Sequence, residues 1–112
     1  MASSGKEIDR EALLIGLRLR DVRVQYGYSL EQFAAKLEIS ASHLSNIECG
    51  RKQPPLPLLI KIATEYDVSL DYIVLGRRDK NRGSFLVLRS NEELLRTFVV
   101  VPKGTRSGLP RS

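Results

Sequence analysis

The chain has 112 residues, of which 42% are hydrophobic and 28% are charged, as expected for one small globular domain and not for a disordered chain. It contains no apolar run of about eighteen residues, and no charged, apolar and small-residue series opens it, so we expect neither a membrane span nor an export signal. One cysteine and one histidine exclude an internal disulfide and argue against a zinc site, and a reducing cytoplasm is the expected compartment.

The net charge of +5 is distributed unevenly along the chain. Residues 1–76 contain nine Lys or Arg and ten Asp or Glu, whereas residues 77–112 contain nine and three. The basic excess therefore lies in the C-terminal part. Any attraction of the first 76 residues to a polyanion must come from the local arrangement of charges.

A first helix is predicted from Asp9 to about Gln25. Apolar residues recur there at helical spacing and alternate with arginines, which indicates an amphipathic helix with a basic outer face. Asp9 can cap its start, and Gly27 can end it in the left-handed conformation. Gly16 weakens the helix slightly.

Two short helices around a tight turn are predicted between Leu30 and Ile47, because apolar residues recur there at spacings of three and four. Ser29 and Gln32 have the spacing of a capping box, and Ser40 can cap the second helix. The outer face of that second helix carries small or hydrogen-bonding side chains and no carboxylate, which suits it to base edges: Ala41, Ser42, Ser45 and Asn46.

The sequence after this pair also predicts helices. Gly50 closes the second helix of the pair, and residues 51–55, RKQPP, form an exposed basic loop because the prolines disfavour a helix. A fourth helix is predicted from about Leu56 to Tyr66, and Ser69 can cap a short fifth helix. The result is a compact, all-helical unit.

The character of the sequence changes after Gly76. Residues 77–84, RRDKNRGS, are charged and aperiodic, which indicates a linker. Residues 85–88 and 98–101 are rich in strand-forming types, while residues 91–96, NEELLR, suit either a capped helical turn or one side of a hairpin. Residues 102–112 have the composition of a disordered segment.

Short motifs follow one another in order between Ile15 and Leu75: RLRDVR at 18–23, GYS at 27–29, Ala34, LSNIE at 44–48, Gly50, Pro54, Ala63 and DVSLDYIVLG at 67–76. In this order they resemble the DNA-binding domain of the Cro and phage-repressor family of helix-turn-helix regulators. The resemblance implies an all-α, five-helix, lambda-repressor-like domain over residues 1–76. It would be followed by the linker at 77–84 and by a C-terminal extension at 85–112.

The resemblance also implies roles for single residues. The family's base-contacting positions fall on Ala41, Ser42, Ser45 and Asn46, of which Asn46 can pair with adenine and Ala41 can touch a thymine methyl. DNA phosphates are expected to be held on either side of that helix by Ser29, Ser40, Arg20, Arg51, Lys52 and Gln53. The alternative for both sets is an ordinary solvated surface.

Three further positions carry structural expectations from the family. Arg23 and Glu48 lie where the resemblance places a partly buried ion pair that joins the first and third helices. Glu38 occupies a turn position where most relatives carry glycine. The backbone at that position tends towards positive φ, which costs another residue about 1 kcal/mol.

No catalytic arrangement is recognisable, so we expect no enzyme and no cofactor. The side chain of Ser42 would point about 100° away from that of His43 around a helix, so the two cannot act as nucleophile and base. Cys49 has no obvious base nearby, and the sequence has no phosphate-cradling glycine loop.

We therefore predict a cytoplasmic, sequence-specific transcription regulator, a repressor that binds a palindromic operator in double-stranded DNA as a homodimer. The alternatives are an antitoxin, the controller of a restriction-modification system, or an interaction adaptor that does not bind DNA. Three interpretations of the extension at 85–112 are open. It could supply strands that pair with another subunit, it could be the start of a β-barrel sensor domain as in some relatives, or it could be a basic arm that touches DNA. We prefer dimerisation. The sequence does not indicate a small-molecule ligand.

Overall fold

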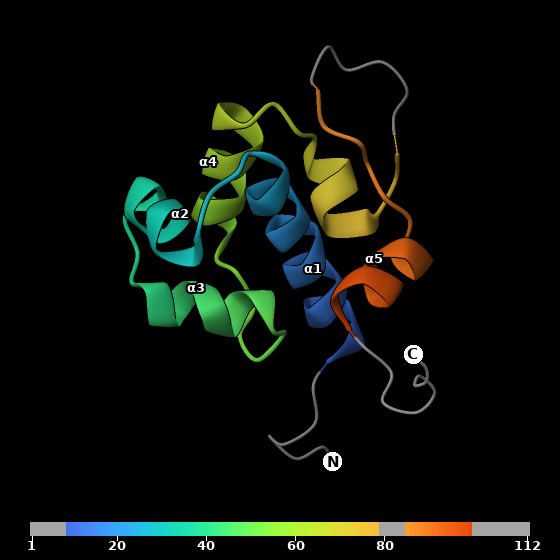
Figure 1. The fold of residues 1–112 in the computed structure, drawn as a ribbon, viewed down its shortest axis with the longest axis horizontal. Coiled ribbons are helices and arrows are strands. Elements are labelled where there is room, and N and C mark those ends of the chain that lie inside the picture. The colour runs from blue at the N-terminus through green and yellow to red at the C-terminus, as the bar shows by residue number, and fades with distance from the viewer. Residues whose placement is uncertain (1–8, 79–84, 100–112) are drawn as a thin grey trace, which may run out of the picture.

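The computed structural model describes residues 9–78 and 85–99, and within these ranges all regular structure is helical. The elements are α1 (Arg10–Gln25), α2 (Leu30–Leu37), α3 (Ala41–Glu48), α4 (Leu56–Glu65), the π-helical turn η1 (Asp71–Leu75) and α5 (Asn91–Phe98). The helix α1 runs through the middle, with α2 and α3 on one side and η1 and α5 on the other (Figure 1).

The helix starts are set by local sequence. The Asp9 carboxylate accepts a hydrogen bond from the Glu11 N–H at the start of α1. Ser29 and Gln32 form the predicted capping box at α2, and Ser40 Oγ accepts from the His43 N–H at α3. Each such cap is worth about 1 kcal/mol, so these boundaries need little tertiary support.

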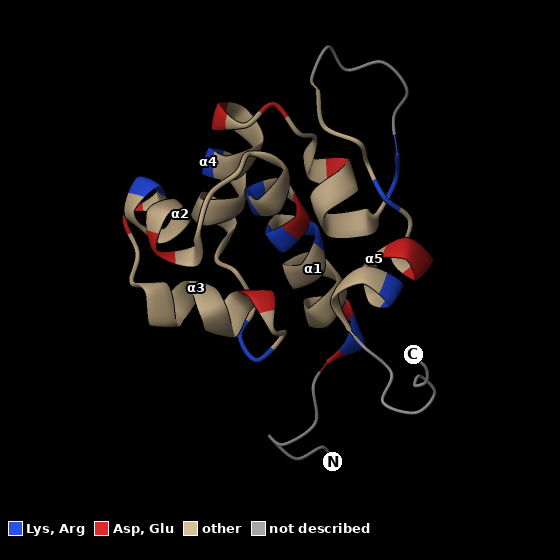
Figure 2. Cartoon of the chain, in the orientation of Figure 1, with Lys and Arg blue, Asp and Glu red and all other residues tan. Residues whose placement is uncertain are grey.

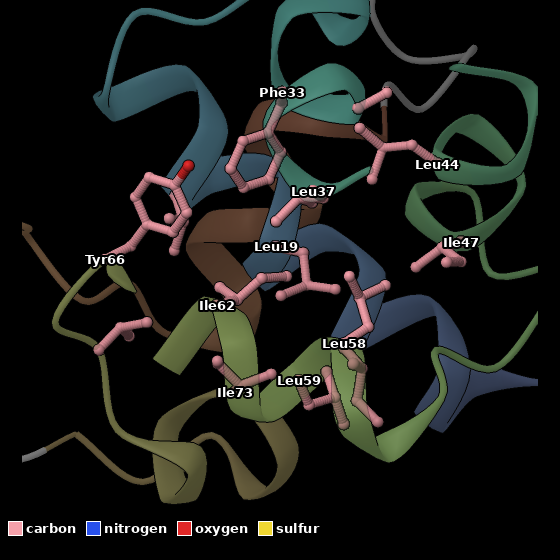
Figure 3. Packing of buried hydrophobic residues seen from close by; sticks show 14 of the residues in the cluster. Leu19, Phe33, Leu37, Leu44, Ile47, Leu58, Leu59, Ile62, Tyr66 and Ile73 are labelled. Atoms are coloured by element: carbon pink, nitrogen blue, oxygen red, sulfur yellow. The ribbon is translucent and has the colours of Figure 1, made fainter. Parts of the chain in front are cut away.

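One hydrophobic core joins the helices described over residues 10–75. Side chains from α1, α2, α3, α4 and η1 meet in it, as the labelled residues of Figure 3 show. The following residues have no exposed surface at all: Leu19, Phe33, Leu44, Ile47, Ile62 and Ile73. Burying a side chain of this size contributes about 1.5–3 kcal/mol. The core therefore fixes α3 rigidly against α1 and α2.

The helices α1 and α3 approach each other closely at Gly16. A Cβ atom added at Gly16 would lie 2.2 Å from the carbonyl oxygen of Ile47 and 2.9 Å from that of Glu48. No larger residue fits without moving one helix. Gly16 lowers the intrinsic stability of α1, but it allows α3 to pack closely against α1.

The described part of the C-terminal extension does not form the strands predicted from its sequence. Residues 85–88 are extended but form no strand; instead the side-chain amide of Gln25 donates to the Val87 carbonyl and accepts from the Val87 N–H, both at 2.9 Å. Asn91–Phe98 is a helix because Ser90 and Glu93 form a second capping box and Leu94 is completely buried. The linker residues 79–84, the strand-like residues 100–101 and residues 102–112 lie outside the described ranges.

The prediction of an exposed basic face on α1 is wrong in part, because the C-terminal extension covers some of its arginines. Arg18 is 3% exposed; its guanidinium donates to the Ile73 carbonyl at 3.0 Å and to Asn91 Oδ1 at 2.8 Å. The Arg20 guanidinium stacks over the Phe98 ring, 4.7 Å from its centroid. The contacts with Asn91 and Phe98 join α1 to residues more than seventy positions away, which helical periodicity cannot reveal.

Candidate nucleic-acid interface

The outward face of α3 carries three of the four predicted base-reading residues. Leu44, Ile47 and Glu48 turn inward, and the opposite side presents the exposed Ser42 and the half-buried Ser45 and Asn46. Ala41, at the start of the helix, is half-buried and packs against the core. The extension helix α5 lies on the other side of α1, so the described part of the extension leaves this face open (Figure 1).

Hydroxyl groups flank this face at the starts of α2 and α3. Ser29 Oγ accepts from the Gln32 N–H at 3.1 Å, and Ser40 Oγ accepts from the His43 N–H at 3.0 Å. Both serines are exposed. A hydroxyl that accepts a capping bond keeps its own proton for a further acceptor, and the first turn of a helix attracts anions.

A basic loop follows the other end of α3. Figure 2 shows α3 without charged residues until Glu48, and the loop beyond it in blue. Arg51, Lys52 and Gln53 in this loop are exposed, and Gln53 Nε2 donates to Asp9 Oδ2 at 3.4 Å. Arg20 does not join this group, because its guanidinium is engaged with Phe98 on α5.

Arg23 and Glu48 form a bidentate ion pair between α1 and α3. The Nε–Oε2 and Nη2–Oε1 distances are 2.8 and 3.0 Å, and Nη1 donates to the Tyr28 carbonyl at 3.0 Å. The two side chains are 13% and 5% exposed. The pair therefore fixes the last turn of α3 and does not face the outward surface.

Glu38 in the turn between α2 and α3 has φ +64°. This is the left-handed region that favours glycine. Its carboxylate is 3.7 Å from Lys61 Nζ but is 80% exposed, and such a surface pair contributes little. The turn therefore keeps the geometry of a glycine-containing turn at some cost in stability.

Asn46 belongs to the predicted base-reading set and Arg51 to the predicted phosphate set, but the two side chains are in contact. Arg51 Nη1 donates to Asn46 Oδ1 at 3.2 Å. The signal that could have shown this contact is the glycine at position 50, because a helix that ends at a left-handed glycine brings these two positions together.

The described residues include no group of three or more His, Cys, Asp or Glu side chains that could hold a metal ion. None of the described helices combines the length and the apolar character needed to cross a membrane.

Comparison with known proteins identifies the domain. Residues 19–73 match the family model described as helix-turn-helix. The chain is 44% identical over 62 residues to the Bacillus subtilis protein named uncharacterized HTH-type transcriptional regulator YobD, covering 55% of this chain and 54% of that one. It is 35% identical over 83 residues to the HTH-type transcriptional regulator ImmR of Bacillus subtilis, covering 71% and 65%.

A third relative is the HTH-type transcriptional regulator SinR of Bacillus licheniformis, 34% identical over 68 residues, which are 60% of each chain. The matches thus span between about half and two thirds of the length of these relatives. No solved structure gives a significant match. The matched residues 19–73 are therefore a helix-turn-helix domain of the Cro and phage-repressor type.

Proposed function

We propose that the chain is a cytoplasmic, non-enzymatic, sequence-specific DNA-binding regulator of transcription that acts as a repressor and needs no cofactor. The observation that carries the proposal is the outward face of α3, polar and free of charge, between exposed serine caps and an exposed basic loop. The relatives named as HTH-type transcriptional regulators support it.

In this proposal α3 lies in the major groove of double-stranded DNA, which is wide enough for a helix and presents a different donor and acceptor pattern for each base pair. Ser42, Ser45 and Asn46 meet base edges. Ala41 offers a methyl group to a thymine at the start of the helix. Since none of these four side chains carries a charge, their contacts discriminate by hydrogen-bond pattern and shape.

Phosphate contacts on both sides would fix the depth and register of α3. Ser29 and Ser40 offer hydroxyl protons on one side, and Arg51, Lys52 and Gln53 offer donors on the other. Arg20 is the weakest member of the predicted phosphate set, because leaving Phe98 would cost its stacking contact.

A homodimer on a palindromic operator follows from the size of the module. One such helix reads too few base pairs for adequate discrimination, and two copies about 34 Å apart would place both recognition helices on one face of the duplex.

Gel shifts with the DNA upstream of the chain's own gene, at two salt concentrations, test the proposal. We expect binding that persists over competitor DNA and weakens with salt. An interaction adaptor without DNA binding would shift no duplex at either salt concentration, and that result would reject the proposed function.

A further inference from the structure

The end of α3 brings Arg51 to the outward face of the helix. The Arg51 N–H donates to the Asn46 carbonyl at 2.9 Å, the Gly50 N–H donates to the Ile47 carbonyl at 3.1 Å, and Gly50 has φ +84°. These two bonds define a Schellman motif, which sets the residue after the glycine against the third-last residue of the helix. Those two residues are Arg51 and Asn46, so the backbone holds them together.

The side chains of Arg51 and Asn46 are joined by a hydrogen bond. Schellman motifs often join these two positions by a hydrophobic contact; here Arg51 Nη1 donates to Asn46 Oδ1 at 3.2 Å. A guanidinium has no acceptor, so the Asn46 amide must turn its oxygen towards Arg51 and its NH₂ group elsewhere. Arg51 thereby selects one of the two orientations of the amide.

We propose that Arg51 is a positioning residue for Asn46 and sets its base preference; this inference rests on the proposed function. With one lone pair of Oδ1 occupied by Arg51, Asn46 presents mainly the two N–H donors of Nδ2 to the base. The guanine edge in the major groove carries two acceptors, whereas adenine carries one acceptor and one donor, and that donor needs a free amide oxygen. The pair therefore favours guanine over adenine.

Lys52 provides a matched control. It is the neighbouring exposed cation, and its backbone N–H shares the Asn46 carbonyl at 3.3 Å. No hydrogen bond from its side chain is found within the described residues. Removing either cation takes one positive charge from the same loop, but only the loss of Arg51 frees the Asn46 amide.

The experiment begins with selection of duplexes from a library with a randomised core, using the full chain. Relative affinities for the four base pairs at each selected position are then measured for the parent and for Asn46→Ala, Arg51→Ala, Lys52→Ala and the double variant Asn46→Ala/Arg51→Ala. We expect Asn46→Ala to flatten the preference at one position of each half-site. Arg51→Ala should lower the guanine-to-adenine ratio at that same position roughly tenfold, in line with the discrimination of one base contact.

Lys52→Ala should weaken binding to every duplex and leave that ratio unchanged. The double variant should show the same base preference as Asn46→Ala alone, because Arg51 acts through Asn46. Thermal melting of each variant verifies that the exposed loop substitutions leave the fold intact.

The inference is overturned if Arg51→Ala keeps the base preferences of the parent and differs from it only in overall affinity, as Lys52→Ala does. A parent that prefers adenine at the position controlled by Asn46 would also overturn it. A library in which the parent enriches no sequence would instead reject sequence-specific DNA binding itself, so the two failures are distinguishable.

Discussion

At the scale of single residues, the stability of α3 depends on a charge pair that water barely reaches. Replacing Glu48 by Gln leaves the Arg23 guanidinium, 13% exposed, without its carboxylate partner. We expect the free energy of unfolding to fall by about 3 kcal/mol. Urea unfolding of Glu48→Gln measures this loss.

Glu38→Gln is the matched control, because its partner contact is long and its side chain is 80% exposed. This control should change the free energy of unfolding by less than about 1 kcal/mol. Equal effects of the two substitutions would show that the Arg23–Glu48 pair does not hold the helices together.

Glu38 itself offers a second prediction. Its φ of +64° is unfavourable for a residue with a side chain, whereas glycine adopts it freely. We expect Glu38→Gly to raise the free energy of unfolding by up to about 1 kcal/mol. Relief of backbone strain stabilises the folded state by more than the extra conformational entropy of glycine stabilises the unfolded chain. A lower melting temperature for Glu38→Gly would contradict this account of the turn.

A third prediction concerns the buried carboxyl of Asp21. Burial raises its pKa above the usual 3.8, although Gln25 Nε2 donates to it at 2.9 Å. The folded-state pKa is thus higher than the unfolded-state pKa. Protonated Asp21 therefore stabilises the fold below the usual pKa, and this contribution is lost as the pH rises through the folded-state value.

Asp21→Asn should remove the loss of stability that accompanies ionisation of the buried carboxyl, because an amide does not ionise. Its oxygen can still accept the hydrogen bond from Gln25. We expect the variant to gain stability relative to the parent as the pH is raised from about 4 to about 7. Urea unfolding at both pH values measures the difference. A difference between variant and parent that does not change with pH would show that burial of the carboxyl has no net effect.

At the scale of the helices, the contact between α1 and α3 requires a residue without a side chain at position 16. Alanine favours a helix over glycine by about 1 kcal/mol, but its Cβ would lie 2.2 Å from the Ile47 carbonyl oxygen. We expect Gly16→Ala to lower the free energy of unfolding by about 1–3 kcal/mol, the usual cost of overpacking. Thr64→Ala, at an exposed position of α4, is a control that should not destabilise. A more stable Gly16→Ala would mean that the helices are further apart than the structure shows.

The helices also show which parts of the fold and of the candidate site are predictable from sequence. Helices α1 to α3 are predictable because their side-chain caps and apolar spacing are local; Ser29 and Gln32 specify the start of α2 on their own. Helix α4 has no side-chain cap, and it is predictable from its apolar spacing and from the proline in its first turn. The stripe of Ser42, Ser45 and Asn46 follows from the same periodicity. The choice between helix and hairpin at residues 91–96 is not local, because it depends on the burial of Leu94, on the packing of α5 against α1 and on the Arg18–Asn91 bond.

At the scale of the whole molecule, the net positive charge lies outside the helix-turn-helix domain, in residues 77–112. Residues 1–76 carry nine basic and ten acidic side chains, so the domain gains little from general attraction to phosphate. The loop after α3 should then supply much of the salt dependence of binding. We expect Lys52→Ala to weaken binding to all duplexes and to reduce the slope of log affinity against log salt by about one. An unchanged slope would place the phosphate contacts elsewhere.

In the proposed function, the outward face of α3 enters the major groove of DNA. Backbone amide shifts followed by NMR during titration with a selected duplex test it most directly. We expect the largest changes at Ser42, Ser45 and Asn46 and at the loop residues Arg51 and Lys52, with small changes on α4. Changes concentrated on α4 or α5, with α3 unaffected at saturating duplex, would contradict it.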